Sequence, residues 1–476
     1  NYHIEIDYAK WNPLHDPDTK ELIKNGNTIG VFYIESPAMR QLQKKTGKSD
    51  FEDIIIHSSI IRPAANIFIN EYIRRLKGGK YKPLHPLLDE ILKETFGIMV
   101  YQEDVSKVVM ALANFSPADA DRLRKIIAKK NTQKQVSDYR ELFFCGTRKN
   151  RIPQKTAEKI WGMIMSFSGY SFCKPHSASY ALVSFKSAYL KAHYPAEFMA
   201  AVISNKGGYY STFAYISEAR RMGLKILMPD INKSQEHYIG YSQYIRVGFM
   251  QIRGLSRKTI KMVISERNKN GLFHSFDDFV IRVKIDTADI VKFVKSGCFD
   301  ELESDNSRAS LLWRLQWHRA EQHTSNKSCS TIDLFHQKEQ KILPLPQAAK
   351  YSHEIMLEHE IETLGFLLSQ HPLTLYKDRI DKIKYVKAID LPKYQGKRVQ
   401  TIGWFINGKT VSTNQQQLME FISFEDTTAI YETTFFPKAY AKFAHMISGT
   451  KPFLLEGIVQ THYNATTLNV EWLSYL

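Results

Sequence analysis

The chain has 476 residues, of which 43% are hydrophobic and 24% charged, and this balance excludes a disordered or a membrane-spanning protein. A formal net charge of +16 indicates a polyanionic partner such as nucleic acid, because each Lys or Arg set on a phosphate releases a condensed counterion. The four cysteines lie far apart, which excludes a paired-cysteine zinc site and a disulfide scaffold and favours a reducing cytoplasm.

The length predicts about three domains. Residues 1–228 are predicted to be mostly helical. One helix is expected to follow Ser116, because a proline at the first helical position and an acid in the first turn stand directly after this N-cap residue. The face opposite its apolar residues carries a cationic stripe of Arg122, Lys125 and Lys129, with Arg124 and Lys130 to either side.

Basic residues dominate the next stretch, since 122–160 holds twelve Lys or Arg against three acids, and such a surface is expected to bind phosphate. A helix is predicted from Ser177 and another from Pro195. Around the first of them, aromatic residues alternate with Lys174 and His176, a combination that can stack bases and contact phosphates. The alternative, an aromatic core stripe with a structural His176, stays open.

From about 223 the pattern changes to short strands and helices, which predicts a second domain over 229–330 and a polar, helical linker over 331–394. After 395 the period becomes two, and several short strands predict a small barrel over 395–476. Asn407 and Gly408 are predicted to form a hairpin turn between two of these strands.

Six strings, in order, resemble motifs of the bacterial C-family DNA polymerases, the DNA polymerase III alpha-subunit kind. They are GVFYIESPAMR (30–40), SSIIRPAAN (58–66), GIMVYQEDV (97–105), ADRLRKIIAKK (120–130), GYSFCKPHSASYAL (169–182) and LKAHYPAEFMAA (190–201). The resemblance implies a multidomain, mainly α protein with fingers over 1–228, a tandem helix-hairpin-helix module over 229–330 and a C-terminal β-barrel of the OB fold.

The resemblance also implies a site for the triphosphate of an incoming dNTP. The corresponding residues are Arg62, Arg124, Lys125, Lys129, Lys130, Lys174 and His176. Three departures from the family pattern favour a divergent, error-prone paralogue over the main replicative enzyme: Lys125 for Arg, Ala64 for Gly and Pro175 for Ser.

The string IRGLSRKTIKMVISERNKNGLFHSFDDF (252–279) resembles a helix-hairpin-helix whose turn directs backbone N–H groups at DNA phosphates. The residues implied are Gly254, Ser256, Arg257 and Lys258, although a purely structural hairpin remains the alternative. The string TIDLF (331–335) resembles a peptide that binds the sliding clamp through Leu334 and Phe335.

The sequence therefore predicts part of a DNA-directed DNA polymerase that acts in replication, repair or error-prone synthesis. Its expected partners are primer-template DNA, dNTP, the sliding clamp and other replisome or mutagenesis subunits. Catalysis needs Mg²⁺, and the motif order implies that the palm aspartates that hold it precede Asn1, so the chain alone is expected to be inactive. The alternative is a non-catalytic DNA-binding accessory protein built from helix-hairpin-helix and OB modules.

Overall fold

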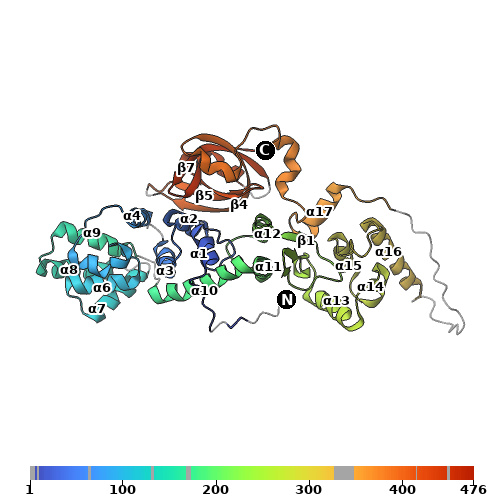
Figure 1. Ribbon diagram of the computed structural model, residues 1–476, viewed down its shortest axis with the longest axis horizontal. Helices are drawn as coiled ribbons and strands as arrows, with labels where there is room; N and C mark the ends of the chain where they lie inside the picture. The colour runs from blue at the N-terminus through green and yellow to red at the C-terminus, as the bar shows by residue number, and fades with distance from the viewer. Residues whose placement is uncertain are drawn as a thin grey trace.

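The structure is a computed structural model that describes residues 6–7, 10–62, 66–129, 133–167, 173–325, 348–413, 415–447 and 451–476. Its shape is elongated, with a helical lobe around α6–α9 at one end, the helices α13–α16 at the other, and a barrel over the middle (Figure 1). The helix α10 runs along the middle of the molecule, below the barrel in this view.

The central body is helical. Its helices are α1 (Pro17–Lys24), α2 (Pro37–Thr46), α3 (Phe51–Ile60), α4 (Asn66–Leu76), α10 (Lys174–His193), α11 (Pro195–Asn205) and α12 (Thr212–Arg221). Both α10 and α11 have a proline in their first turn. Proline fits there because the first N–H groups of a helix have no acceptor within the helix, so its missing N–H costs no hydrogen bond. The predicted helix from Ser177 is confirmed, but it begins earlier, at Lys174.

The helical lobe has a core of its own. Its helices are α5 (Pro86–Ile91), η1 (Lys93–Thr95), α6 (Gln102–Ala113), α7 (Pro117–Ala128), α8 (Gln133–Lys149) and α9 (Gln154–Met165). The predicted start of α7 is confirmed, because the Ser116 side chain accepts a hydrogen bond from the Asp119 N–H at 3.1 Å. Leu123 and Ile127 are buried on the apolar face of α7, as their spacing predicts.

The next region shares one continuous hydrophobic core with the central body. A small sheet has the order β1-β3-β2, with β1 parallel and β2 antiparallel to β3. The elements are β1 (Lys225–Leu227), β2 (Ile239–Tyr241), β3 (Tyr244–Arg246), η2 (Phe249–Gln251), α13 (Arg257–Asn270), α14 (Phe276–Arg282), α15 (Thr287–Lys295), α16 (Arg308–Ser325) and α17 (His353–Leu364). The shared core makes this region a rigid extension of the body, because close-packed interiors deform little.

A closed barrel of order β4-β5-β6-β8-β7 follows, with β6 and β8 parallel and the other pairs antiparallel. It is reached through η3 (Pro372–Tyr376), α18 (Lys377–Ile380) and η4 (Ala388–Tyr394). Its elements are β4 (Arg398–Ser412), β5 (Leu418–Glu425), β6 (Ile430–Phe435), α19 (Pro437–Phe443), η5 (Ala444–Met446), β7 (Pro452–His462) and β8 (Ala465–Tyr475). The five-stranded barrel confirms the predicted fold class, mainly helical with a C-terminal OB-type barrel.

The predicted hairpin turn at Asn407 and Gly408 is wrong. Both residues lie inside β4, opposite Ser423 and Ile422, just after a register shift. A Cβ atom on Gly408 would lie 2.7 Å from Oε1 of the Glu420 side chain, across the strand pair.

No helix in the described ranges is long and apolar enough to cross a membrane.

Candidate functional site

The segment 99–103 leads into α6 and is the centre of the candidate site. Its shape is set by Asp104, whose carboxylate accepts hydrogen bonds from the N–H groups of Val100 and Tyr101, both at 2.9 Å. Burial raises the pKa of Asp104 to about 6, against the lowering effect of these two hydrogen bonds. Asp104 thus works as a structural cap that holds the segment in one conformation.

Arg62 contacts this segment at Met99. Its guanidinium donates hydrogen bonds at 3.1 Å to the Met99 carbonyl and to Ser166 Oγ, and it lies 3.5 Å from the centre of the Phe167 ring. The side chain is buried. Because a buried guanidinium offers little surface to a ligand, Arg62 is placed to support the segment, while its predicted contact with nucleotide stays a prediction.

Arg124 of α7 contacts the same segment at Gln102. Its Nη1 donates to Gln102 Oε1 at 2.8 Å, while Nε and Nη2 donate to Asp121 Oδ1 at 3.1 and 2.7 Å. Lys125 Nζ lies 2.8 Å from the other oxygen of Asp121. These two cations hold the pKa of Asp121 below its usual value, so the predicted cationic stripe is partly neutralised in this structure.

Lys174 begins α10 and contacts the segment at Tyr101 and Glu103. Its Nζ lies 2.8 and 2.6 Å from the two oxygens of Glu94 and 5.2 Å from the centre of the Tyr101 ring. Its backbone N–H donates to Glu103 at 3.3 Å. On the same helix, the ring centroids of His176 and Tyr180 lie 4.1 Å apart.

The structure therefore brings Arg62, Arg124 and Lys174 together around residues 99–103, although they are far apart in sequence. Lys129 stands at the C-terminal cap of α7, where its N–H donates to the Ile126 carbonyl. Other residues named from the sequence lie outside the described ranges: Ala64, Lys130, Leu334 and Phe335.

Sequence reasoning missed the acids and amides that hold these cations. Asp121 could have been found, because carboxylates three and four positions before Arg and Lys pair with them on a helix. Gln102 and Glu94 could not, since their contacts with Arg124 and Lys174 join segments 22 and 80 residues apart.

The predicted hairpin before α13 is well ordered. Gly254 has a φ of +71°, which a side chain would disfavour, and its carbonyl accepts a hydrogen bond from Lys292 Nζ at 2.7 Å. Ser256 caps α13 by accepting from the Thr259 N–H at 3.0 Å. Arg257 is exposed and pairs with Glu236 at 2.6 Å. The turn has the geometry of a helix-hairpin-helix, while its contact with DNA stays a prediction.

A groove of about 770 Å³ lies along α13 and the end of α14. Six of its lining side chains are cationic and only Glu266 is acidic; the cations are Arg257, Lys258, Lys261, Lys269, Arg282 and Lys284. Arg282 is held by Glu266 and Asp278 at 3.0 Å each. The sequence prediction named only the first two of these cations, so the groove extends the expected phosphate-binding surface along the helix.

Metal-binding geometry is absent from the described parts of the chain, where no group of three or more His, Cys, Asp or Glu side chains is placed to hold an ion. These residues do not fit a resident Mg²⁺ site.

Comparisons with known proteins agree with these two regions. Residues 1–151 match the family model of the bacterial DNA polymerase III alpha subunit finger domain, and residues 223–311 match a helix-hairpin-helix motif. The DNA polymerase III subunit alpha of Borreliella burgdorferi is 33% identical over 463 residues, which cover 94% of this chain and 39% of that protein. That of Escherichia coli O157:H7 is 31% identical over 470 residues, which cover 94% of this chain and 40% of that protein.

The chain thus spans about two fifths of the length of the curated relatives it matches. The similarity to these relatives covers 94% of this chain. This chain belongs to the bacterial DNA polymerase III alpha-subunit family.

Proposed function

We propose that this chain is part of a DNA-directed DNA polymerase of the DNA polymerase III alpha type, and that it binds the incoming dNTP and the primer-template. The observation that carries the proposal is that Arg124 and Lys174, 50 residues apart in sequence, both contact residues 101–103, while the buried Arg62 supports the same segment at Met99. Charge-assisted hydrogen bonds from Arg and Lys to phosphate are strong, so two such side chains that reach one segment can bind a triphosphate together.

The acids beside these cations do not prevent triphosphate binding. The side chains of Arg124 and Lys125 are 28% and 64% exposed, and Asp121 is 45% exposed. Exposed ion pairs contribute only about 0–1 kcal/mol, because water screens them. A triphosphate carries several charges and offers bidentate acceptors, so it can displace Asp121 from Arg124 and Glu94 from Lys174.

Arg62 has a supporting role in this proposal. Its hydrogen bond to the Met99 carbonyl fixes the segment on which Arg124 rests through Gln102. His176, in the first turns of α10, is proposed to face the nucleotide beside Lys174. Lys129 and Lys130 remain proposed phosphate contacts at the end of α7.

Mg²⁺ would supply Lewis-acid chemistry for this reaction. The described residues offer no ligand set for it, so we assign the ions to aspartates outside the matched stretch. The sliding clamp and other replisome or mutagenesis subunits are proposed partners, with the clamp bound through Leu334 and Phe335. We place the protein in the cytoplasm. The departures at Lys125, Ala64 and Pro175 support an error-prone paralogue over the main replicative enzyme.

The nucleotide site is tested by replacing Arg124 and Lys125 with Gln in the 476-residue chain. We expect the Kd for dATP to rise about 10- to 100-fold, because charge-assisted hydrogen bonds contribute about 1.5–3 kcal/mol each and Asp121 already offsets part of that. Calorimetric titration of dATP into the chain measures the change.

The control is Lys155→Gln with Lys159→Gln, which removes the same charge from exposed positions of α9 in the same lobe. An equal loss of affinity in both variants would mean that general charge, and not this site, attracts the nucleotide. No loss in either would remove the nucleotide site from the proposal.

Duplex binding is tested at the groove along α13 with Lys261→Gln and Lys284→Gln. Each lysine that neutralises a phosphate releases counterions, so the salt dependence of log K for a primer-template duplex should become shallower by about 2. The loss should be equal for unrelated sequences. Fluorescence anisotropy at several salt concentrations measures both.

The matched control for the groove is Lys233→Gln with Lys295→Gln. These lysines are held by Glu301 and Glu362 and do not line the groove. We expect the salt slope of this variant to stay close to that of the unsubstituted chain. If the two double variants gave the same slope, the groove would not be the duplex-binding surface.

The alternative function is a non-catalytic DNA-binding accessory protein. Such a protein would bind DNA through the same helix-hairpin-helix and barrel but would have no fingers domain. It does not account for the match of residues 1–151 to a polymerase finger domain, so we favour the polymerase.

A further inference from the structure

One outer face of the barrel is covered. In β5 the residues Ile422 and Phe424 point into the barrel core, so their neighbours Ser423 and Glu425 point outward. Nevertheless Ser423 is only 2% exposed and Glu425 is fully buried, while Phe421 on the same face is 45% exposed. The second half of this face is therefore in contact with another part of the protein.

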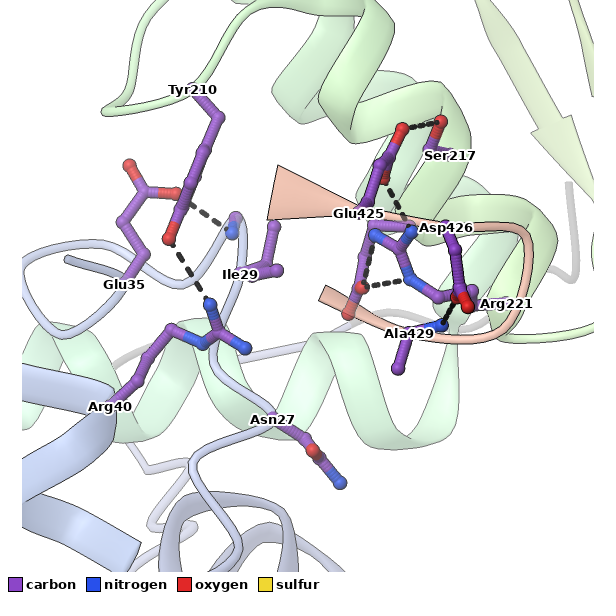
Figure 2. A network of polar contacts seen from close by, with 12 residues as sticks. Asn27, Ile29, Glu35, Arg40, Tyr210, Ser217, Arg221, Glu425, Asp426 and Ala429 are labelled. Carbon is purple, nitrogen blue, oxygen red and sulfur yellow. Dashed lines mark hydrogen bonds and ion pairs between the residues drawn. The ribbon is translucent and has the colours of Figure 1, made fainter. Parts of the chain in front are cut away.

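The covering element at the end of β5 is α12. Glu425 accepts a hydrogen bond from Ser217 Oγ at 2.9 Å and from Arg221 Nη1 at 2.7 Å. His371 Nε2 lies 3.1 Å from the same carboxylate. Figure 2 shows Ser217 and Arg221 converging on Glu425 from the body. A fully buried carboxylate needs such partners, because burying it alone is costly.

A second contact joins β6 to α2. Arg40 Nη1 lies 3.6 Å from Glu432, whose other oxygen accepts a hydrogen bond from Ser423 at 2.6 Å. The same guanidinium donates to the Tyr210 hydroxyl at 3.2 Å (Figure 2). It also donates to the Gly26 carbonyl at 3.0 Å, so it is held in the body. Burial raises the pKa of Glu432, which Arg40 opposes.

On the body, Arg221 is itself held in place by further ion pairs. Arg221 shares Glu218 with the buried Lys191, whose Nζ also donates to two backbone carbonyls near the start of the chain. The cations that hold the barrel thus belong to a network that extends into the core. A rigid set of donors loses little conformational entropy on contact with the barrel.

The turn between β7 and β8 lies on the same side of the barrel. Asn464 and Thr466 line a hollow of about 210 Å³ together with Arg40 and Lys44 of α2. Lys77, just after α4, has its Nζ 5.9 Å from the centre of the Tyr463 ring. The body therefore covers part of the β5–β6 face and lies beside this turn, whose residues 462–464 stay exposed.

OB barrels bind oligonucleotides with the face of their second and third strands and with the loops between strands 1–2 and 4–5. Here the second and third strands are β5 and β6, and the 4–5 loop is the β7–β8 turn. We propose that this face is a docking surface for the α2–α12 body of the same chain, and that it is closed to single-stranded nucleic acid.

The charges of the face fit that role. Glu425 and Glu432 attract the two arginines of the body and would repel phosphates. The inference does not depend on the proposed polymerase function, since a docked barrel leaves the groove along α13 and the site around residues 99–103 unchanged.

The test is thiol protection in the 476-residue chain with Cys145, Cys173 and Cys329 replaced by Ser. Ser423→Cys places a thiol on the covered part of the face, and Phe421→Cys places one on the open part of the same strand. We expect a thiol-reactive probe to modify Ser423→Cys about 100-fold more slowly than Phe421→Cys, because reaction requires the barrel to leave the body. Arg40→Met with Arg221→Met should raise the rate at Ser423→Cys by about tenfold or more, because it leaves buried carboxylates unpaired.

Equal rates at the two positions in the chain with both arginines present would overturn the docking. A thymidine oligonucleotide supplies the second arm of the test. Unchanged protection of Ser423→Cys in its presence supports a closed face, while acceleration toward the rate of Phe421→Cys would show that single strands open the face. If the arginine variant fails to fold, the comparison of the two single thiols still decides the question.

Discussion

Replacing Lys191 with Met is expected to lower the free energy of unfolding of the central body by about 3–5 kcal/mol, because it leaves a buried carboxylate without its main partner. Lys191 is 2% exposed, and its Nζ donates to the Asn27 and Ile29 carbonyls and to Glu218 Oε1, each at 2.8 Å. Burial would raise the pKa of Glu218, but Lys191 and Arg221 outweigh it and hold that pKa at about 2. The carboxylate is therefore charged at neutral pH and needs this ammonium group.

Urea unfolding followed by circular dichroism measures the loss, with Lys186→Met as the control. Lys186 lies on the same helix but is partly exposed, so its replacement should cost less than about 1 kcal/mol. Adding Glu218→Leu to Lys191→Met should recover part of the loss, because an apolar pair has no uncompensated charge. If Lys191→Met were as mild as the control, the pair would not be a stabilising contact.

Gly146→Ala should destabilise the helical lobe by about 3 kcal/mol, since overpacking against a rigid neighbour is costly. A Cβ atom at Gly146 of α8 would lie 2.0 Å from the Ala113 carbonyl oxygen and 2.7 Å from its Cα atom, at the end of α6. Backbone atoms cannot rotate away as a flexible side chain can, so α6 and α8 must separate. Because α6 begins at the candidate nucleotide site, dATP affinity should fall as well.

The matched control is Gly162→Ala in α9 of the same lobe. Nothing lies within 4 Å of a Cβ atom there, so alanine should stabilise the helix by about 0.5–1 kcal/mol through its higher helix propensity. Hydrogen exchange of the amides in α6–α9 measures both effects locally, which suits a chain with several cores. Equal exchange in the two variants would contradict the close helix crossing.

Short-range features of the fold could be predicted from the sequence. The N-cap at Ser116 and the prolines that begin α10 and α11 act on the residue or two beside them. The alternation after 395 predicted a barrel, because strands with one buried face repeat every two residues. The Asn407 and Gly408 prediction failed, since β4 continues through both residues and pairs them with β5, a contact that the dipeptide alone does not specify.

The candidate site was predicted in part. The sequence by itself determined the family, through motifs in order, and the cations Arg62, Arg124 and Lys174 as candidates for phosphate binding. It also contained the pairing of Asp121 with Arg124 and Lys125, because residues three and four apart meet on any helix.

Only the tertiary structure decided that those cations lie around residues 99–103 and which of them are exposed to solvent. Arg62 is buried against Phe167, while Lys125 stays exposed. This difference in exposure comes from the packing of segments that are distant in sequence. The covered face of the barrel was decided in the same way. From the sequence alone Glu425 could have faced water, whereas in the structure it is buried and paired with Arg221. The physical reason is that burial and charge partners depend on contacts between residues far apart in the chain, which local spacing does not specify.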